Sequence, residues 1–233
     1  MNRTGRMRLA AVAGALAVSG CAVSATNVDP GPSVTSASSG VLSVEAVRQL
    51  TRDISFDYDV VASNKELADL SDVVLSGDMV EVSAGPQFGK AGENDGLSKI
   101  QSVVLQVRAD DVAKGPVKPG ESLYLVVYAP DGVDAAAWNK AVPAGTAVAV
   151  YATRSPNDAP KEGSTGIDTI DWRAGRPAGA ALYVPSVQGL AVQVEDGTLY
   201  WPLTDVTRAG AVAAALPGGD AVGNPLPGED EPG

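Results

Sequence analysis

The sequence contains no histidine, and only one of its 233 residues, Cys21, is a cysteine. Without histidine the chain cannot build a Ser-His-Asp or Cys-His catalytic arrangement, or a zinc site that uses histidine. A single cysteine cannot form a disulfide within the chain, so a hydrophobic core must stabilise the folded domain. These two absences exclude common hydrolase chemistries and a disulfide-stapled scaffold.

Basic residues are also scarce: the chain has 17 against 28 acidic ones, which gives a net charge of −11. The first 20 residues carry three arginines and no acid, so the chain from Cys21 has 14 basic residues against 28 acidic ones, a net charge of −14. No stretch after residue 20 gathers lysines or arginines. Such a surface repels phosphate backbones, and we exclude nucleic-acid binding.

The N-terminal segment has the order of a secretory signal. Three arginines among the first eight residues precede an uncharged apolar run at 9–18, and the small residues Ser19 and Gly20 lead to Cys21. At about 1.5 Å per residue, a helix of this run covers roughly half of a ~30 Å hydrocarbon core. An export signal therefore explains the segment better than a membrane-spanning helix.

The residues Val18, Ser19, Gly20 and Cys21 resemble the lipobox of bacterial lipoprotein precursors. The resemblance implies cleavage before Cys21, a diacylglyceryl group on its sulfur, acylation such as palmitate on the new amino terminus, and a place on the extracytoplasmic face of the cell membrane. Two or three acyl chains on one residue are enough for stable anchoring. The alternative is an ordinary signal peptide that is cleaved near Ala22 or Ala25.

Composition divides the chain into four parts. Residues 1–20 are the expected signal peptide, and residues 21–40, rich in Ser, Thr, Pro and Gly, are expected to form a disordered, lipid-anchored tether. Residues 41–216 carry the periodic apolar patterns of a folded domain. Residues 217–233, rich in Pro and Gly and ending in a run with three acids, are expected to be a disordered acidic tail.

Within 41–216 the patterns favour strands over helices. A short amphipathic helix is predicted at 41–52 with Ser43 as its cap, and a second one follows the capping-box spacing of Ser63 and Glu66. Strands are predicted at 54–60, 72–83, 100–109, 122–128, 146–153, 180–184, and in a hairpin of 189–194 with 198–202. We expect a mainly β fold, either a small antiparallel barrel or a sandwich, and we favour the barrel.

A second resemblance covers most of this domain. The β segment that opens after a short helix (66–82), the strand that runs into 112–115, and the late Gln188-Gly189-Leu190 are similar to uncharacterised secreted domains of high-GC Gram-positive (actinobacterial) bacteria. The resemblance implies a small barrel of the OB-like kind and an extracytoplasmic location. It assigns no catalytic residue.

Two groups of acids are candidate ligand-facing residues. Asp57 and Asp59 would point to one face of a strand, where they could bind a cation or act as an acid and base, or simply form a solvated face. Asp168 and Asp171 lie beside Trp172 in a long irregular stretch, a combination that could recognise a sugar or a peptide. The alternative is a tryptophan that holds its loop against the domain.

Trp201 is the third candidate, because it closes the final hairpin next to Tyr200 and would form an exposed aromatic face together with Tyr183. The alternative is that all three aromatics belong to the core. Exposure decides between the two interpretations.

These observations predict a membrane-anchored lipoprotein that is not an enzyme and that binds a protein or a glycan of the cell envelope. A carrier of a small apolar ligand inside the barrel is one alternative. A hydrolase that uses Asp57, Asp59, Asp168 and Asp171 is another. We predict no cofactor and no metal site.

Overall fold

The structure is a computed structural model that describes residues 42–52, 54–89, 100–156, 168–194 and 197–224. The predicted signal peptide, the lipobox, Cys21 and the tether lie outside these residues, as does the end of the predicted tail from residue 225. The side chains of residues 168–170 are not described either.

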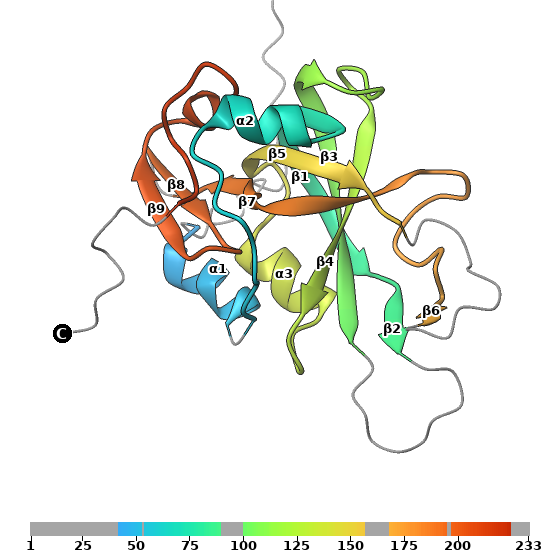
Figure 1. Cartoon of the computed structure of the whole chain (residues 1–233). Helices are drawn as coiled ribbons and strands as arrows, with labels where there is room; N and C mark the ends of the chain where they lie inside the picture. Colours follow the sequence, from blue (N-terminus) through green and yellow to red (C-terminus); the bar gives the residue numbers. More distant parts are fainter. Residues whose placement is uncertain (1–41, 53, 90–99, 157–167, 195–196, 225–233) are drawn as a thin grey trace, which may run out of the picture. The chain divides into compact units, whose positions relative to one another are not determined.

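Seven strands form one sheet in the order β4-β3-β1-β5-β7-β8-β9, and all of these neighbours are antiparallel. A parallel pairing also joins β4 to β7. The predicted mainly β fold is confirmed (Figure 1). The strands are β1 (Val73–Ala84), β3 (Gln101–Lys114), β4 (Ser122–Ala129), β5 (Ala147–Arg154), β7 (Leu182–Gln193), β8 (Thr198–Trp201) and β9 (Val206–Ala209), and β2 (Gln87–Gly89) pairs separately with β6 (Asp168–Ile170).

The long strands β1 and β3 form the centre of the sheet, and a glycine allows them to approach. Val, Leu and Met dominate the buried positions of β1, as expected for a strand that packs against a core. Gly77 lies so close to the carbonyl oxygen of Arg108 on β3 that a Cβ atom would overlap it. The pairing changes register beside this point, between Ser76 and Gly77, as at a β-bulge.

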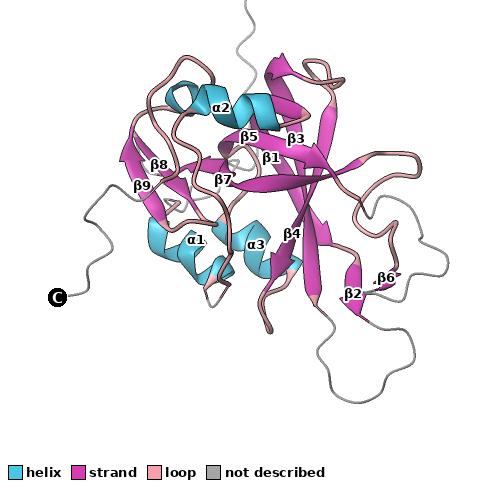
Figure 2. Cartoon of the chain, in the orientation of Figure 1, coloured by secondary structure: helices cyan, strands magenta, loops and turns pink. Residues whose placement is uncertain are grey.

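Short helices lie on two sides of the sheet, and each begins at a capping side chain. Ser43 caps α1 (Val44–Thr51) and Ser63 caps α2 (Asn64–Leu70), so the two predicted helices are confirmed. In Figure 2, α2 lies above the sheet and α1 and α3 (Ala135–Ala141) lie below it. The sequence patterns did not predict α3, which Asp134 caps, or the 3₁₀ turn η1 (Val212–Ala215).

The predicted strand at 54–60 is wrong. This segment is irregular, although its side chains still alternate between half-buried positions such as Phe56 and Tyr58 and exposed ones such as Asp57 and Asp59. It connects α1 to α2 across the surface, where none of the strands that the structure describes pairs with it. The alternation therefore reflects one side facing the domain and one facing water.

The predicted strands at 180–184 and 189–194 form one strand, β7. Pro185 removes a backbone donor, but it lies at the register shift opposite Ala152, where the ladder is already interrupted. Gly189 lies within the interruption, and it packs so closely on the carbonyl of Tyr151 that only glycine fits. Proline and glycine mark an irregularity within this strand rather than its end.

The boundary predicted after residue 216 is too early. Ala221 and Asn224 are buried, and the Asn224 side-chain amide donates to the carbonyl of Val61 at 2.6 Å. Asn64 of α2 donates from its amide to the carbonyls of Gly219 and Ala221. Residues 217–224 therefore pack against the domain.

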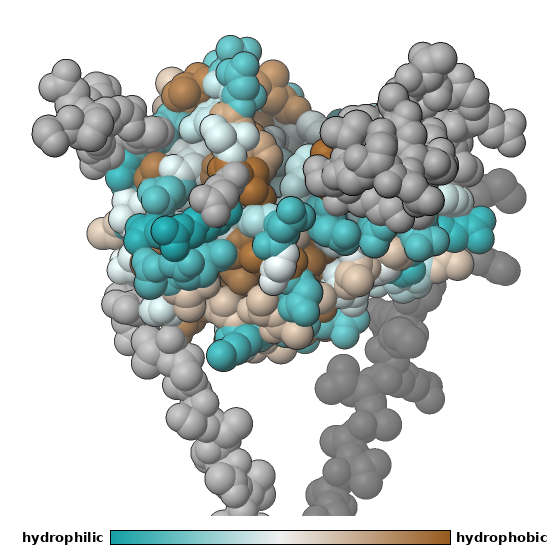
Figure 3. All heavy atoms as spheres, turned by 90° about the horizontal axis from the view of Figure 1, so that it is seen from below, coloured by the Kyte–Doolittle hydropathy of each residue, from teal (hydrophilic) through white to brown (hydrophobic). Residues whose placement is uncertain are grey.

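The side that carries α1 and α3 has a mixed surface. In Figure 3, which views the domain from below, hydrophobic atoms form small areas that hydrophilic side chains separate. Large continuous apolar areas often mark protein interfaces. The described residues visible in this view form no such area.

Candidate functional site

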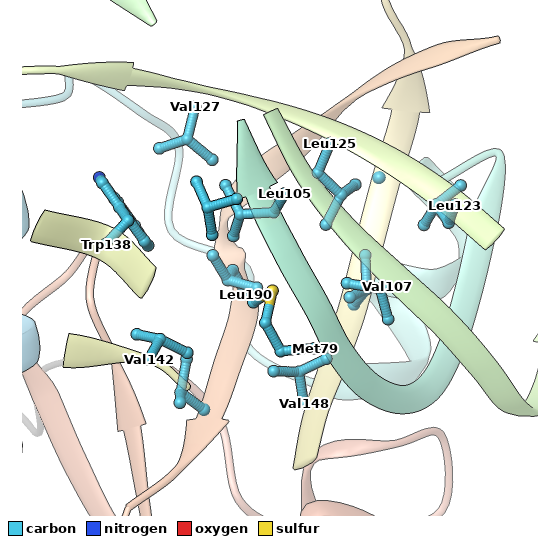
Figure 4. Packing of buried hydrophobic residues seen from close by; sticks show 14 of the residues in the cluster. Met79, Leu105, Val107, Leu123, Leu125, Val127, Trp138, Val142, Val148 and Leu190 are labelled. Carbon is cyan, nitrogen blue, oxygen red and sulfur yellow. The ribbon is translucent and has the colours of Figure 1, made fainter. Parts of the chain in front are cut away.

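Side chains from five strands and one helix fill the interior of the sheet system. Leu125, Leu105 and Leu190 meet Met79 and Val148 there, and Trp138 of α3 closes one end (Figure 4). Each of these side chains is 3% exposed or less. The interior is thus a packed core, and the pockets that could hold a ligand lie at the surface.

The first pocket has a volume of about 540 Å³ and lies between α1, the segment 54–58 and residues 200–205. We call it the α1 pocket. The Arg48 Nε donates to Asp205 Oδ1 at 2.7 Å, and the Tyr200 hydroxyl donates to the same carboxylate oxygen at 3.0 Å. A second nitrogen of Arg48 donates to Glu45 at 3.1 Å.

In this network the positive charge of Arg48 is neutralised by the carboxylates of Asp205 and Glu45. The hydrogen bond that Arg48 donates to the Asp205 carboxylate is the main cause that raises the pKa of Arg48. Burial, and then the neighbouring Asp205 carboxylate, raise the pKa of Tyr200. Asp205 holds its position with a φ of +53°, a left-handed conformation that aspartate tolerates better than most residues. The hydrogen bonds of Asp205 in the α1 pocket thus hold α1 against the loop between β8 and β9.

A second pocket, with a volume of about 340 Å³, is lined by Arg154, Trp172, Arg173, Arg176 and residues 177–180. We call it the arginine–tryptophan pocket. The guanidinium carbon of Arg173 lies 4.6 Å from the centre of the Trp172 ring, and that of Arg176 lies 5.8 Å from it. Both distances are within the range of cation–π attraction. The indole therefore holds two guanidinium groups in place.

A tight turn after β6 positions these residues. The amide of Ala174 donates to the carbonyl of Asp171 at 2.7 Å, and Asp171 adopts a φ of +52°. Gly175 has a φ of +78°, and a Cβ there would lie 2.7 Å from the side chain of Val104 on β3. The turn thus rests directly on the sheet, and the Arg176 Nε closes it by donating to the carbonyl of Ala180 at 2.9 Å.

The structure does not assemble the predicted acids into one site. Asp57 and Asp59 are exposed, and neither lines the α1 pocket or the arginine–tryptophan pocket. Asp171 is exposed beside Trp172, and Asp168 belongs to β6, but its side chain is outside the described set. No group of three potential metal-ligating side chains occurs among the described residues.

The expected exposed aromatic face does not form. Trp201 is 2% exposed, Tyr200 is fully buried, and Tyr183 is 6% exposed. The chain after residue 217 covers Trp201, because Gly223 packs so tightly on its indole ring that a Cβ would overlap it. These aromatics belong to the core, and their role is packing.

Sequence reasoning selected Trp172 but missed Arg154 and Arg176. Seven arginines follow Cys21 in this acidic chain, and three of them line one pocket. Two of them, Arg173 and Arg176, lie three residues apart directly after Trp172, and this spacing was the only local signal in the sequence. Arg154 joins them from the end of β5.

Comparisons with known proteins give no match: no family model, no curated protein and no solved structure is similar to this chain. None of the helices that the structure describes combines the length and the apolar character that a membrane crossing requires. Function must be inferred from the residues themselves.

Proposed function

We propose that the protein is a lipid-anchored binding module on the extracytoplasmic face of the cell membrane, without enzymatic activity of its own. The observation that carries the binding role is the contrast between a filled interior and a surface pocket lined by three arginines. The lipobox resemblance at Cys21 supports the anchor. The partner is a component of the cell envelope.

We further propose that the domain is a small barrel of the OB-like kind. The strands run in the order β4-β3-β1-β5-β7, and the parallel pairing of Tyr124 with Leu182 brings the last of them back to the first. The helix α3 lies in the connection between β4 and β5. This topology supports closure of five strands around the packed core.

OB-like barrels bind ligands with the face of their second and third strands and with two flanking loops. The corresponding parts here are β3, β4 and the connections at 85–100 and 155–181. The pairing of β2 with β6 joins these two connections, and the arginine–tryptophan pocket belongs to the second one. The pocket therefore lies where such a fold would place a ligand.

The two alternatives receive less support. An apolar ligand inside the barrel would compete for space with Leu105, Leu190 and Met79, which already pack there. A hydrolase would need its carboxylates beside a pocket, whereas Asp57 and Asp59 face water away from both pockets.

Intact-mass analysis tests the anchor. The protein extracted from its membrane should have the mass of a chain that starts at Cys21 plus lipid, and the Cys21→Ser variant should lose both the cleavage and the lipid. A soluble wild-type product without lipid would contradict the anchor and leave a secreted domain.

Affinity capture tests the binding role. Full-length protein in an uncharged detergent, immobilised and exposed to a solubilised envelope fraction, should retain an envelope component that a matched, heat-unfolded sample does not retain. Retention of nothing above that background would contradict the proposed function.

A further inference from the structure

Tyr128 differs from every other aromatic residue of the chain. The structure describes all 11 aromatic residues, and Tyr128 is the only exposed one among them, with 40% of its surface open to water. The other ten are buried or half-buried. The packing of the domain therefore does not account for the position of this ring.

A second exposed hydrophobic side chain, Ile100, lies close to Tyr128. The amide of Ile100 donates to the carbonyl of Phe88 at 2.8 Å, and the amide of Phe88 donates back at 3.0 Å, so that β2 lies beside the start of β3 (Figure 1). The Phe88 ring meets the Tyr128 ring edge-on, with the ring centres 5.4 Å apart. Phe88 thus links the two exposed side chains.

The register of β3 and β4 places Ile100 and Tyr128 on the same face of the sheet. Ser102 lies opposite Tyr128 in the ladder, and Ile100 precedes Ser102 by two residues. Side chains two residues apart in a strand point to the same face. Diagonal neighbours of this kind are about 7–8 Å apart, so one partner can contact both. We call Ile100, Tyr128 and the Phe88 ring between them the Tyr128 surface.

A pocket with a volume of about 350 Å³ adjoins the Tyr128 surface. Ser102, which faces Tyr128 in the ladder, lines this pocket together with Gln101 and the segment 131–135 at the start of α3. Asp131 and Asp134 are its only charged lining residues, and both are exposed. We call it the aspartate pocket.

The two aspartates keep their negative charge available. Among the described residues, no lysine or arginine forms an ion pair with Asp131 or Asp134. Asp134 accepts the amide of Ala137 at 2.8 Å as the cap of α3, a bond that uses one oxygen and leaves the charge in place. An apolar surface therefore lies next to an acidic pocket.

Charge selects the kind of partner that fits. The chain from Cys21 has 28 acidic residues against 14 basic ones, so it repels anionic lipids and acidic glycans and attracts cations. Tyrosine is also one of the residue types that contribute most to protein–protein binding. An exposed tyrosine beside two carboxylates thus fits a basic protein segment better than a lipid or a glycan.

We propose that the Tyr128 surface and the aspartate pocket together bind a protein segment that carries an apolar side chain close to a lysine or arginine. The apolar side chain packs on Ile100 and Tyr128, and the basic side chain enters the pocket beside Asp131. This inference goes beyond the proposed function, because it adds a second surface that shares no lining residue with the arginine–tryptophan pocket.

Arrays of blocked hexapeptides, probed with full-length protein in an uncharged detergent at low salt, test this proposal. The first set contains two basic and two apolar residues in every order, the second has glutamate in place of the basic residues, and the third has serine in place of the apolar ones. Members of the first set should bind, the second set should not bind, and the third should bind more weakly. Added salt should weaken binding of the best peptide in solution.

Variants locate the surface. Tyr128→Ser should weaken binding of the best peptide by roughly 10-fold, as truncation of an interface tyrosine does. Asp131→Asn combined with Asp134→Asn should weaken it by roughly 3- to 10-fold, and asparagine still caps α3. The matched controls are Leu70→Ser, which removes another exposed apolar side chain, and Asp57→Asn, which removes another exposed charge. Both should bind as wild type does.

The thermal midpoint of each variant shows whether it is folded. If Tyr128→Ser lowers the midpoint, Ile100→Ser takes its place as the apolar variant. No binding of the first set above the glutamate set, or equal binding by wild type and the folded apolar variant, would overturn the inference. Equal binding of the serine set would overturn its apolar part.

Other occupants of the surface give different results. A dimer of the wild type, or its binding to phosphatidylglycerol vesicles, that Tyr128→Ser abolishes would assign the surface to a second copy or to the membrane and overturn the inference. Envelope capture that persists without peptide binding would leave the proposed function standing and this inference refuted. Peptide binding without envelope capture would support the Tyr128 surface and refute the envelope role.

Discussion

Two arginines illustrate how two pockets of one domain differ. Arg48 in the α1 pocket donates to Asp205 and Glu45, and the shared carboxylate also accepts from Tyr200. Arg173 in the arginine–tryptophan pocket lies on an indole ring and has no carboxylate partner among the described contacts. The first guanidinium is neutralised within the fold, while the second keeps its charge available.

The larger pocket is therefore not the better candidate. The α1 pocket has a volume of about 540 Å³, against about 340 Å³ for the arginine–tryptophan pocket. Its polar groups, however, already form hydrogen bonds with one another and hold α1 against the loop after β8. Perturbing the α1 pocket should change stability without changing ligand binding. Substitution of Arg173 in the arginine–tryptophan pocket should weaken ligand binding with little change in stability.

The largest expected effect comes from Gly175→Ala, which breaks the support of the arginine–tryptophan pocket. A Cβ at this position meets Val104 at 2.7 Å and the carbonyl of Ala84 at 2.9 Å, and the φ of +78° is itself unfavourable for alanine. Unfolding by denaturant should show a loss of about 3 kcal/mol, the sum of strain and overpacking, together with loss of envelope capture.

Gly132→Ala is the control for that experiment. Gly132 has a φ of +83°, but a Cβ there would meet nothing within 4 Å. The free energy of unfolding of Gly132→Ala should decrease only by the cost of the left-handed backbone conformation, about 1 kcal/mol. Equal losses in the two variants would contradict the close packing of the turn on β3.

Asp205→Ala should have the next largest effect, and only on stability. It removes the acceptor of the buried Tyr200 hydroxyl, while the ion pair with Arg48 is partly exposed and contributes little. Denaturant unfolding should show a loss of about 1–2 kcal/mol. Asp205→Asn keeps an acceptor and should lose less stability. Weaker envelope capture by either variant would refute the separation of the pockets.

The α1 pocket should also make stability depend on alkaline pH. Burial raises the pKa of Tyr200, so the unfolded state loses its hydroxyl proton first, near pH 10, while the folded state retains it. The free energy of unfolding should therefore decrease as the pH rises above about 10. Tyr200→Phe should make this decrease smaller in denaturant titrations.

Arg173→Gln should have the smallest effect on stability. The side chain is exposed and its contact is a single cation–π interaction, so the free energy of unfolding should change by about 0.5 kcal/mol or less. A decrease in stability as large as that of Asp205→Ala would mean that Arg173 stabilises the fold as Arg48 and Asp205 do, and would contradict the difference between the two pockets.

Local patterns predicted the elements whose causes are local. Ser43 and Ser63 each accept a hydrogen bond from an amide three residues on, so α1 and α2 could be recognised from capping residues alone. The helix α3 was missed, because its sequence AAAWNKA lacks a repeated apolar face and Trp138 alone anchors it in the core. The strand β7 was divided, because a bulge places proline and glycine inside it.

The candidate site depended on distant contacts and was only partly predictable. Trp172 was identified from its neighbours in the sequence, but its contact with Arg176 depends on a turn that rests on Val104. Arg154 reaches the same pocket from the end of β5. Trp201 was misjudged for a similar reason, because a segment beyond residue 217 covers it. Sequence patterns show which face of an element is apolar, but not which remote segment will cover it.

Fluorine NMR of protein labelled with 5-fluorotryptophan tests the central claim most directly, because the three tryptophans report on three regions. Trp172 lies in the arginine–tryptophan pocket, whereas Trp138 and Trp201 lie in the core. With the signal assigned from a Trp172→Phe variant, addition of the envelope component that affinity capture retains should move the Trp172 resonance alone. A shift of Trp138 or Trp201, or no shift of Trp172, would contradict a surface binding site at this pocket.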